Sequence, residues 1–132
     1  MKALFPHAEE TRSLIVRVVV NFMPEQSEPG KGRWFWAYHI RLENHGEMAV
    51  QLLTRRWDIR DSRGGQHIVE GEGVVGEQPV IKPGASYDYV SSCALTTTNG
   101  TMQGSYNMIG EDGSRFDVAI PKFALNAPVS VK

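Results

Sequence analysis

Residues 70–83, EGEGVVGEQPVIKP, contain the motif whose interpretation decides the fold of this chain. The glycines at positions 71, 73 and 76 have the G-x-G-x-x-G spacing, which cradles a pyrophosphate when it follows a strand and opens a helix. Here two prolines, at positions 79 and 83, follow the glycines, and the valines and isoleucine of the segment favour an extended backbone. The stretch therefore predicts a connection between strands and not the start of a doubly wound nucleotide-binding fold.

Short apolar alternations separated by turns fill the rest of the chain. Residues 14–22 and 34–44 alternate with a period of two, which predicts strands with one buried face. Further strands are expected at 48–61, 66–70, 87–95, 101–109 and 115–120, with turns at 44–46, 61–65, 99–100 and 110–113. Because strands recur about every ten residues without a helical period, the sequence predicts an all-β antiparallel sandwich of about seven to nine strands.

Two positions depart from this regular pattern. In the strand at 48–61, Arg55 has the same parity as Leu53, Trp57 and Ile59, which indicates either a bulge or a functional arginine. Pro121 is expected to end the last strand or to cause a bulge, because proline cannot donate a ladder hydrogen bond. Trp57 is the expected central anchor between the two sheets.

Length and composition indicate one globular domain. A chain of 132 residues buries roughly two-thirds of its unfolded surface and needs no metal or disulfide for stability. We expect an N-terminal arm at residues 1–13 that can add to the domain edge, the domain itself at 14–125, and a C-terminal tail at 126–132. Hydrophobic residues make up 41% of the chain, as in ordinary folded proteins, and no segment has low-complexity composition.

Charge and cysteine content narrow the partners and the compartment. The net charge of −1 provides no long-range field for nucleic acid or an anionic membrane, so neither is an expected partner. The single cysteine excludes an intrachain disulfide, and no signal segment or bilayer-spanning apolar run of ~20 residues is visible. A cytoplasmic protein is expected.

Several motifs in the second half of the chain are specific in combination. They are Arg55–Asp58, Gly71-x-Gly73-Val74-Val75-Gly76-x-x-Pro79, Lys82-Pro83-Gly84, Tyr89-x-Ser91-x-Cys93, Gly100-x-Met102-x-Gly104-x-Tyr106 and Phe116-x-Val118-x-Ile120-Pro121. Together with YHIRLENHGE at residues 38–47, they closely resemble the ApaG family over residues 14–125. The resemblance implies an immunoglobulin-like sandwich of the fibronectin type III kind and a family without an established catalytic activity.

The same resemblance bears on function. Bacterial ApaG genes lie beside that of a diadenosine-tetraphosphate hydrolase and have been linked to cobalt resistance and magnesium efflux. Related domains in eukaryotic F-box proteins and in a DNA-polymerase-delta-interacting protein are regarded as protein-interaction modules. We therefore expect a non-enzymatic module that binds a protein partner through the loop at 70–83 or through an exposed edge strand, with homodimerisation as a further use of such an edge.

A small-ligand site is the alternative hypothesis. Consecutive N–H groups of the glycine loop would form an anion-binding nest for pyrophosphate, ATP or a dinucleoside polyphosphate, assisted by nearby cationic side chains. The candidate residues are Gly71, Gly73, Val74, Val75, Gly76, Arg55, Arg56 and Lys82. If the loop instead has a purely structural role, the glycines serve turns and bulges, and the two valines, Val74 and Val75, cover the end of the sandwich.

The sequence predicts no catalytic residue, cofactor or metal site. The four histidines, His7, His39, His45 and His67, show no H-x-x-x-H or Cys–His spacing, so divalent cation binding is only a third hypothesis. Cys93 has no local signature of an activating base. A small packed side chain is the expected role of this cysteine.

Overall fold

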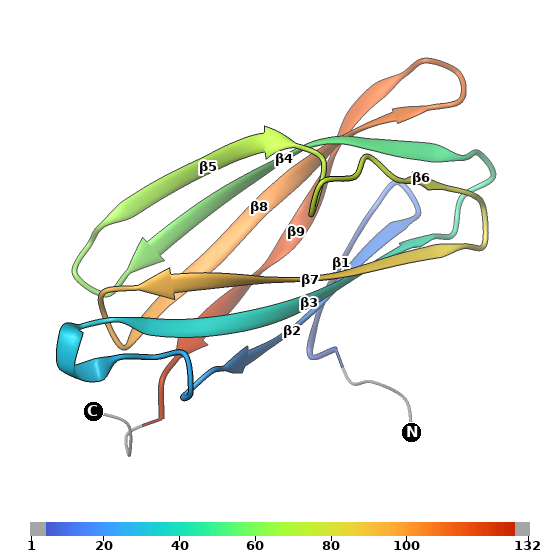
Figure 1. The fold of residues 1–132 in the computed structure, drawn as a ribbon. Coiled ribbons are helices and arrows are strands. Elements are labelled where there is room, and N and C mark those ends of the chain that lie inside the picture. The colour runs from blue at the N-terminus through green and yellow to red at the C-terminus, as the bar shows by residue number, and fades with distance from the viewer. Residues whose placement is uncertain (1–4, 129–132) are drawn as a thin grey trace.

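The computed structural model describes residues 5–128, which form two antiparallel sheets packed face to face (Figure 1). The strands are β1 (His7–Thr11), β2 (Leu14–Phe22), β3 (Trp34–Asn44), β4 (Val50–Asp61), β5 (Gln66–Glu72), β6 (Val80–Ile81), β7 (Ser86–Leu95), β8 (Asn99–Gly110) and β9 (Arg115–Asn126). A single 3-10 turn, at Pro29–Lys31, is the only helical element of this range. Residues 1–4 of the expected arm and 129–132 of the expected tail lie outside the described residues.

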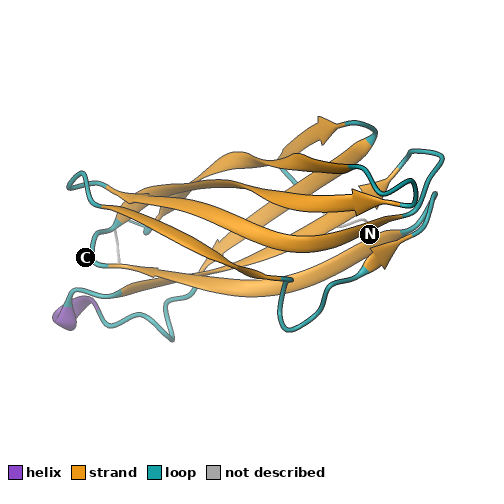
Figure 2. Cartoon of the chain, turned by 90° about the horizontal axis from the view of Figure 1, so that it is seen from above, coloured by secondary structure: helices purple, strands orange, loops and turns teal. Residues whose placement is uncertain are grey.

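The order of the strands defines the fold. One sheet has the order β1-β2-β3-β7 and the other has the order β5-β4-β8-β9, with the short β6 paired to the start of β4. Without β1 and β6, three strands face four in the arrangement of a fibronectin type III sandwich. Figure 2 shows the two layers from above. The predicted all-β antiparallel sandwich is confirmed, and no helix among residues 5–128 is long and apolar enough to cross a membrane.

Regular alternation explains the first sheet. In β3, every second side chain points into the sandwich and is buried. These inward residues are Trp36, Tyr38, Ile40 and Leu42, and each is at most 5% exposed. The bounds of β2 and β3 match the predicted ranges, because one face of each strand is uniformly apolar.

Trp57 anchors the core, as predicted. It is 3% exposed, and its ring centroid lies 5.4 Å from that of Tyr38 in the opposite sheet and 6.0 Å from that of Phe123 in β9. Packing across the two layers therefore converges on one aromatic cluster.

A bulge changes the expected faces of β4. The register with β8 shifts between Leu52 and Thr54, and Leu52 is fully buried whereas Leu53 is only partly covered. The placement of Leu53 on the apolar face is therefore wrong. The bulge that the sequence suggested is therefore present, but it precedes Arg55, which keeps the same inward parity as Trp57.

Two later elements also differ from expectation. The turn predicted at Asn99–Gly100 is wrong, because both residues already belong to β8 and the bend lies at residues 96–98. The last strand continues through Pro121 to Asn126, six residues further than predicted for β9. A register shift opposite Pro121 accommodates the missing N–H, which agrees with the bulge expected there.

The two flanks of the sandwich differ. On one flank β1 and β2 lie against β9, and the N–H of Ala119 donates to the hydroxyl of Thr11 at 3.3 Å. On the other flank β5 and β7 are the outermost strands of their sheets, and no further strand of residues 5–128 pairs with their outer edges (Figure 1). We call this second flank, between β5 and β7, the open side.

Candidate functional site

The glycine-rich connection between β5 and β6 is a closed turn. Val74 and Glu77 exchange two backbone hydrogen bonds, of 2.8 and 2.9 Å, and the N–H of Gly73 donates to the carbonyl of Leu53 at 2.8 Å. Gly73 and Gly76 have φ values of 64° and 83°, which glycine adopts without strain. Local turn chemistry therefore accounts for two of the three glycines of the motif.

These contacts leave little for a phosphate. Within Gly73–Gly76, only the N–H groups of Val75 and Gly76 lack a partner among residues 5–128. The expectation that both valines cover the end of the sandwich is correct for Val74, which is 1% exposed, and wrong for Val75, which is 58% exposed. Nucleotide binding by this loop stays a prediction, to be checked by following its amide signals during a titration with ATP or pyrophosphate.

Of the three candidate cationic side chains, the structure brings only that of Arg55 to the loop. Arg55 reaches it on the inner face of β4, whereas Arg56 points to the outer face and the exposed Lys82 follows β6. The outer-face hollow beside Arg56, of about 440 Å³, is also lined by the carboxylates of Glu70, Glu72 and Asp117. Negative side chains thus outnumber positive ones there, which disfavours an anionic ligand.

The geometry of the turn requires a glycine at position 73. A Cβ at this position would lie 2.2 Å from the carbonyl oxygen of Glu77, so we expect Gly73→Ala to cost roughly 2–3 kcal/mol of unfolding free energy. Gly76→Ala is the matched control, because its φ is also positive but its Cβ would meet open space. The control should lose only about 1 kcal/mol in urea unfolding. Equal losses would contradict the role assigned to the Glu77 contact.

Gly71 serves a different purpose, because it makes room for Arg55. A Cβ at Gly71 would lie 2.8–2.9 Å from the guanidinium atoms of Arg55, so the side chain packs directly on the backbone of β5. Nη1 of Arg55 donates to the carbonyls of Glu72 and Gly73 at 3.1 and 2.9 Å. No carboxylate of residues 5–128 forms a salt bridge with this guanidinium.

A groove of about 530 Å³ runs along the open side beside Arg55. Tyr38 and Trp57 contribute aromatic surface, and the inward side chains of β5, His67 and Val69, line one wall. The other wall is made by four consecutive residues of β7, 91–94. The size is in the range of sites that bind ligands or peptide side chains.

Exposed apolar side chains are concentrated in the segments that border the open side, and Val69 among them lines the groove. Every large hydrophobic residue that is exposed in the described range lies between positions 68 and 90, in β5, the glycine loop, β6 and β7. They are Ile68, Val69, Val75, Val80 and Val90. In β5, all residues except Gly71 are exposed, on both faces of the strand. The open side therefore combines two free strand edges with the apolar surface that typically marks an interaction site.

Burial favours the neutral forms of one thiol and two tyrosine hydroxyl groups in and near the groove. It raises the pKa of the Cys93 thiol to about 11, so that the thiolate needed of a nucleophile is disfavoured at neutral pH. Burial likewise raises the pKa of Tyr89 and of Tyr106, whose hydroxyl groups bond to each other. Cys93 is partly buried beside the aromatic cluster, in agreement with its predicted packing role.

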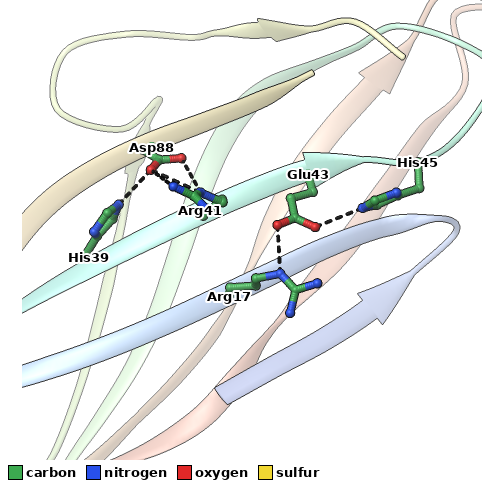
Figure 3. Close-up of polar contacts among 6 residues, drawn as sticks. All are labelled: Arg17, His39, Arg41, Glu43, His45 and Asp88. Carbon is green, nitrogen blue, oxygen red and sulfur yellow. Dashed lines mark hydrogen bonds and ion pairs between the residues drawn. The ribbon is translucent and has the colours of Figure 1, made fainter. Parts of the chain in front are cut away.

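Charged side chains cluster on the outer face of the first sheet (Figure 3). Asp88 accepts hydrogen bonds from Arg41 at 2.9 and 3.0 Å, and its carboxylate lies 2.9 Å from Nε2 of His39. The hydrogen bond from Arg41 is the main reason why the pKa of Asp88 is lowered. Within residues 5–128 no group of three or more metal-ligating side chains occurs, and these two basic partners leave the carboxylate satisfied.

The neighbouring Glu43 gives a pH-dependent prediction. Its carboxylate accepts a 2.8 Å hydrogen bond from Arg17 and lies 2.9 Å from His45, and the Arg17 contact chiefly lowers the pKa of Glu43. A lowered pKa means that the stabilisation is present above about pH 4.3 and is lost as the pH falls through the folded-state pKa. We expect Glu43→Gln to lose roughly 0.5–1 kcal/mol at pH 7.

Urea unfolding of the wild type and Glu43→Gln over a pH series checks this expectation. The two curves should converge in acid, where the wild-type carboxyl is protonated. A difference that stays constant down to pH 3 would show that the ion pair contributes nothing. Glu47→Gln is a suitable control, since Glu47 is exposed and forms no salt bridge among the described residues.

The strand order of the two packed sheets defines an antiparallel β-sandwich domain. A sequence model of the ApaG domain matches residues 24–110. "Protein ApaG" of Afipia carboxidovorans is 54% identical over 118 residues, which cover 89% of this chain and 91% of that protein. "Protein ApaG" of Caulobacter vibrioides is 48% identical, with 89% and 84% covered. The chain therefore belongs to the ApaG family.

Solved structures agree with this assignment. The crystal structure of the putative ApaA protein from Bordetella pertussis has a TM-score of 0.85 and 40% identity, covering 88% of this chain and 94% of that one. The C-terminal domain of Wzt, at 8% identity and a TM-score of 0.54, shares the fold alone.

Proposed function

We propose that the protein is a non-enzymatic binding module whose protein partner docks on the open side between β5 and β7. The observation that carries this proposal is the exposure of β5. Six of its seven residues are exposed, including Ile68 and Val69, at 41% and 40%. An edge strand with exposed apolar side chains, which no other strand of residues 5–128 covers, is a surface to which a partner strand can add.

The chemistry of the open side fits binding better than catalysis. Cys93, the one nucleophilic thiol of the chain, is held in its protonated form by burial. A single cysteine suits a reducing compartment, and we place the interaction in the cytoplasm. We further propose that the family's link to cobalt resistance and magnesium efflux acts through this protein partner.

Site-specific photocrosslinking in the native cell lysate tests the docking surface. The photoreactive residue p-benzoylphenylalanine would replace Ile68 in β5 or Val90 in β7, which are both exposed and border the open side. Asp117, exposed on the outer face of β9, is the control position. We expect the same partner to be crosslinked from positions 68 and 90 and not from 117.

Two results decide between partners and surfaces. A product of twice the chain mass from positions 68 and 90 would identify the partner as a second copy of this chain. Crosslinks that are equally strong from 117, or that arise from 117 alone, would contradict docking on the open side.

A further inference from the structure

We propose that the partner segment is an extended acidic peptide that pairs with the free edge of β7 and directs a side-chain carboxylate at Arg55. This inference rests on the proposed function and specifies the chemistry of the partner. It follows from three separate features of the groove, which are the wall formed by β7, the unused donors of Arg55 and the apolar surface beside them.

The wall formed by β7 identifies the edge that is used. Successive side chains of a strand point to opposite faces, so a groove over one face is lined by alternate residues. On β5 the lining residues are alternate, His67 and Val69, whereas on β7 they are the consecutive residues 91–94. A run of consecutive residues is what a strand presents at its edge. The other edge of β7 is paired with β3 over residues 86–95, and no strand within residues 5–128 pairs with the edge that faces the groove.

The second feature is the guanidinium of Arg55. Only Nη1 has hydrogen-bond partners, and both are backbone carbonyls, so Nε and Nη2 lack an acceptor among residues 5–128. No carboxylate of this range neutralises the charge, although the side chain is only partly exposed. Half-buried guanidinium groups are normally paired, and a carboxylate matches the planar arrangement of their donors.

The third feature is the surface beside Arg55. Trp57, Val69 and Met102 line the same groove, so apolar side chains should flank the acidic residue of the peptide. In an extended peptide, residues two apart point in the same direction. The recognised pattern is therefore apolar-x-Asp/Glu-x-apolar, with β-branched or aromatic residues at the apolar positions.

Selection of a phage-displayed random peptide library on the full-length protein tests the inference. We expect enriched sequences to carry this pattern, and the synthetic peptide of the most enriched sequence to shift the amide signals of residues 91–94. Arg55→Gln should weaken its binding by roughly 10- to 100-fold, as expected for a lost charge-assisted contact. Arg56→Gln changes the net charge equally on the opposite face and should leave binding unchanged.

A second pair of variants avoids any disturbance of the loop that Arg55 holds. Val69→Glu adds a carboxylate to the groove wall while Arg55 and its two carbonyl contacts remain, and it should weaken the peptide as strongly as Arg55→Gln. Val69→Gln is nearly the same size as Val69→Glu and loses the same apolar surface without adding a charge, so it should weaken binding much less than Val69→Glu. If both variants bind equally well, Arg55 does not recognise a carboxylate.

The outcomes separate this inference from the proposed function. Enriched peptides that shift residues 91–94 but lack acidic residues would overturn the role of Arg55 and support docking on the open side. Peptides that shift other surfaces alone would overturn both. If no sequence is enriched, the inference fails, and the crosslinks at positions 68 and 90 decide the docking surface independently.

Discussion

The Trp57→Ala variant is expected to lose about 3–5 kcal/mol of unfolding free energy, the largest effect of any single truncation considered for this domain. The indole is 3% exposed and contacts aromatic rings from both sheets, Tyr38 and Phe123. Removing it leaves a cavity between two layers whose strands cannot collapse onto it independently. For a domain of this size, the melting temperature should fall by roughly 10–20 °C.

Chemical denaturation and thermal melting followed by circular dichroism measure this loss. Trp34→Ala is the control, because Trp34 starts β3 near one end of the sandwich and is only partly buried. It should lose less than half as much. A Trp57→Ala variant that is no less stable than Trp34→Ala would contradict the central position of the aromatic cluster.

The second large effect is expected at Asn44, a polar side chain that is 2% exposed. Its Nδ2 donates to the carbonyls of Ile81 and Met48 at 2.9 and 3.0 Å, and its Oδ1 accepts from the N–H of Gly46 at 2.9 Å. One side chain thus ties β6 and the turn after β3 together. Asn44→Ala leaves three backbone groups without these partners and should cost about 2–4 kcal/mol.

The Asn44→Asp variant tests the two hydrogen bonds that Nδ2 donates separately from the one that Oδ1 accepts. It keeps the shape and the oxygen that faces Gly46, but it places a carboxylate against two carbonyl oxygens. This environment raises the carboxyl pKa above its ordinary value, so the variant should be least stable at neutral pH and should recover as the pH falls. Wild-type stability of Asn44→Asp at pH 7 would show that the Nδ2 contacts contribute nothing.

Regular alternation made much of the fold predictable. The bounds of β3 follow from its sequence, because each inward position from Trp36 to Leu42 is apolar and each outward one is polar or small. The bulge at Leu53 was indicated only by the parity of Arg55. Its location depends on pairing with β8, which a single strand does not encode.

The turn at Asn99–Gly100 shows a limit of local rules. An Asn-Gly pair favours a tight turn, yet here both residues belong to the start of β8, and a Cβ at Gly100 would lie 2.3 Å from the carbonyl oxygen of Arg60. The glycine is required by this close approach of two strands. Such a contact between segments forty residues apart has no signature in the local sequence.

The candidate site was predicted in part. The sequence drew attention to the glycine loop and Arg55, and the structure brings these together through Gly71. It did not bring Arg56 or Lys82 to the loop, and it showed loop N–H groups paired within the protein. The groove was not predicted, because it arises from the strands that remain unpaired in each sheet. The one available signal was the presence of adjacent apolar residues, Ile68 and Val69, on opposite faces of one short strand.

The central claim is tested most directly by hydrogen exchange of the protein alone and in complex with the partner that the crosslinking experiment identifies. Addition of a partner strand satisfies backbone N–H groups at a free edge, which slows their exchange. In the complex, we predict slower exchange at the β7 edge, in residues 91–94, and in β5. Exchange should not change in β1 and β9, which lie on the opposite flank. Slower exchange confined to β1 and β9, with β5 and β7 unchanged, would contradict docking on the open side.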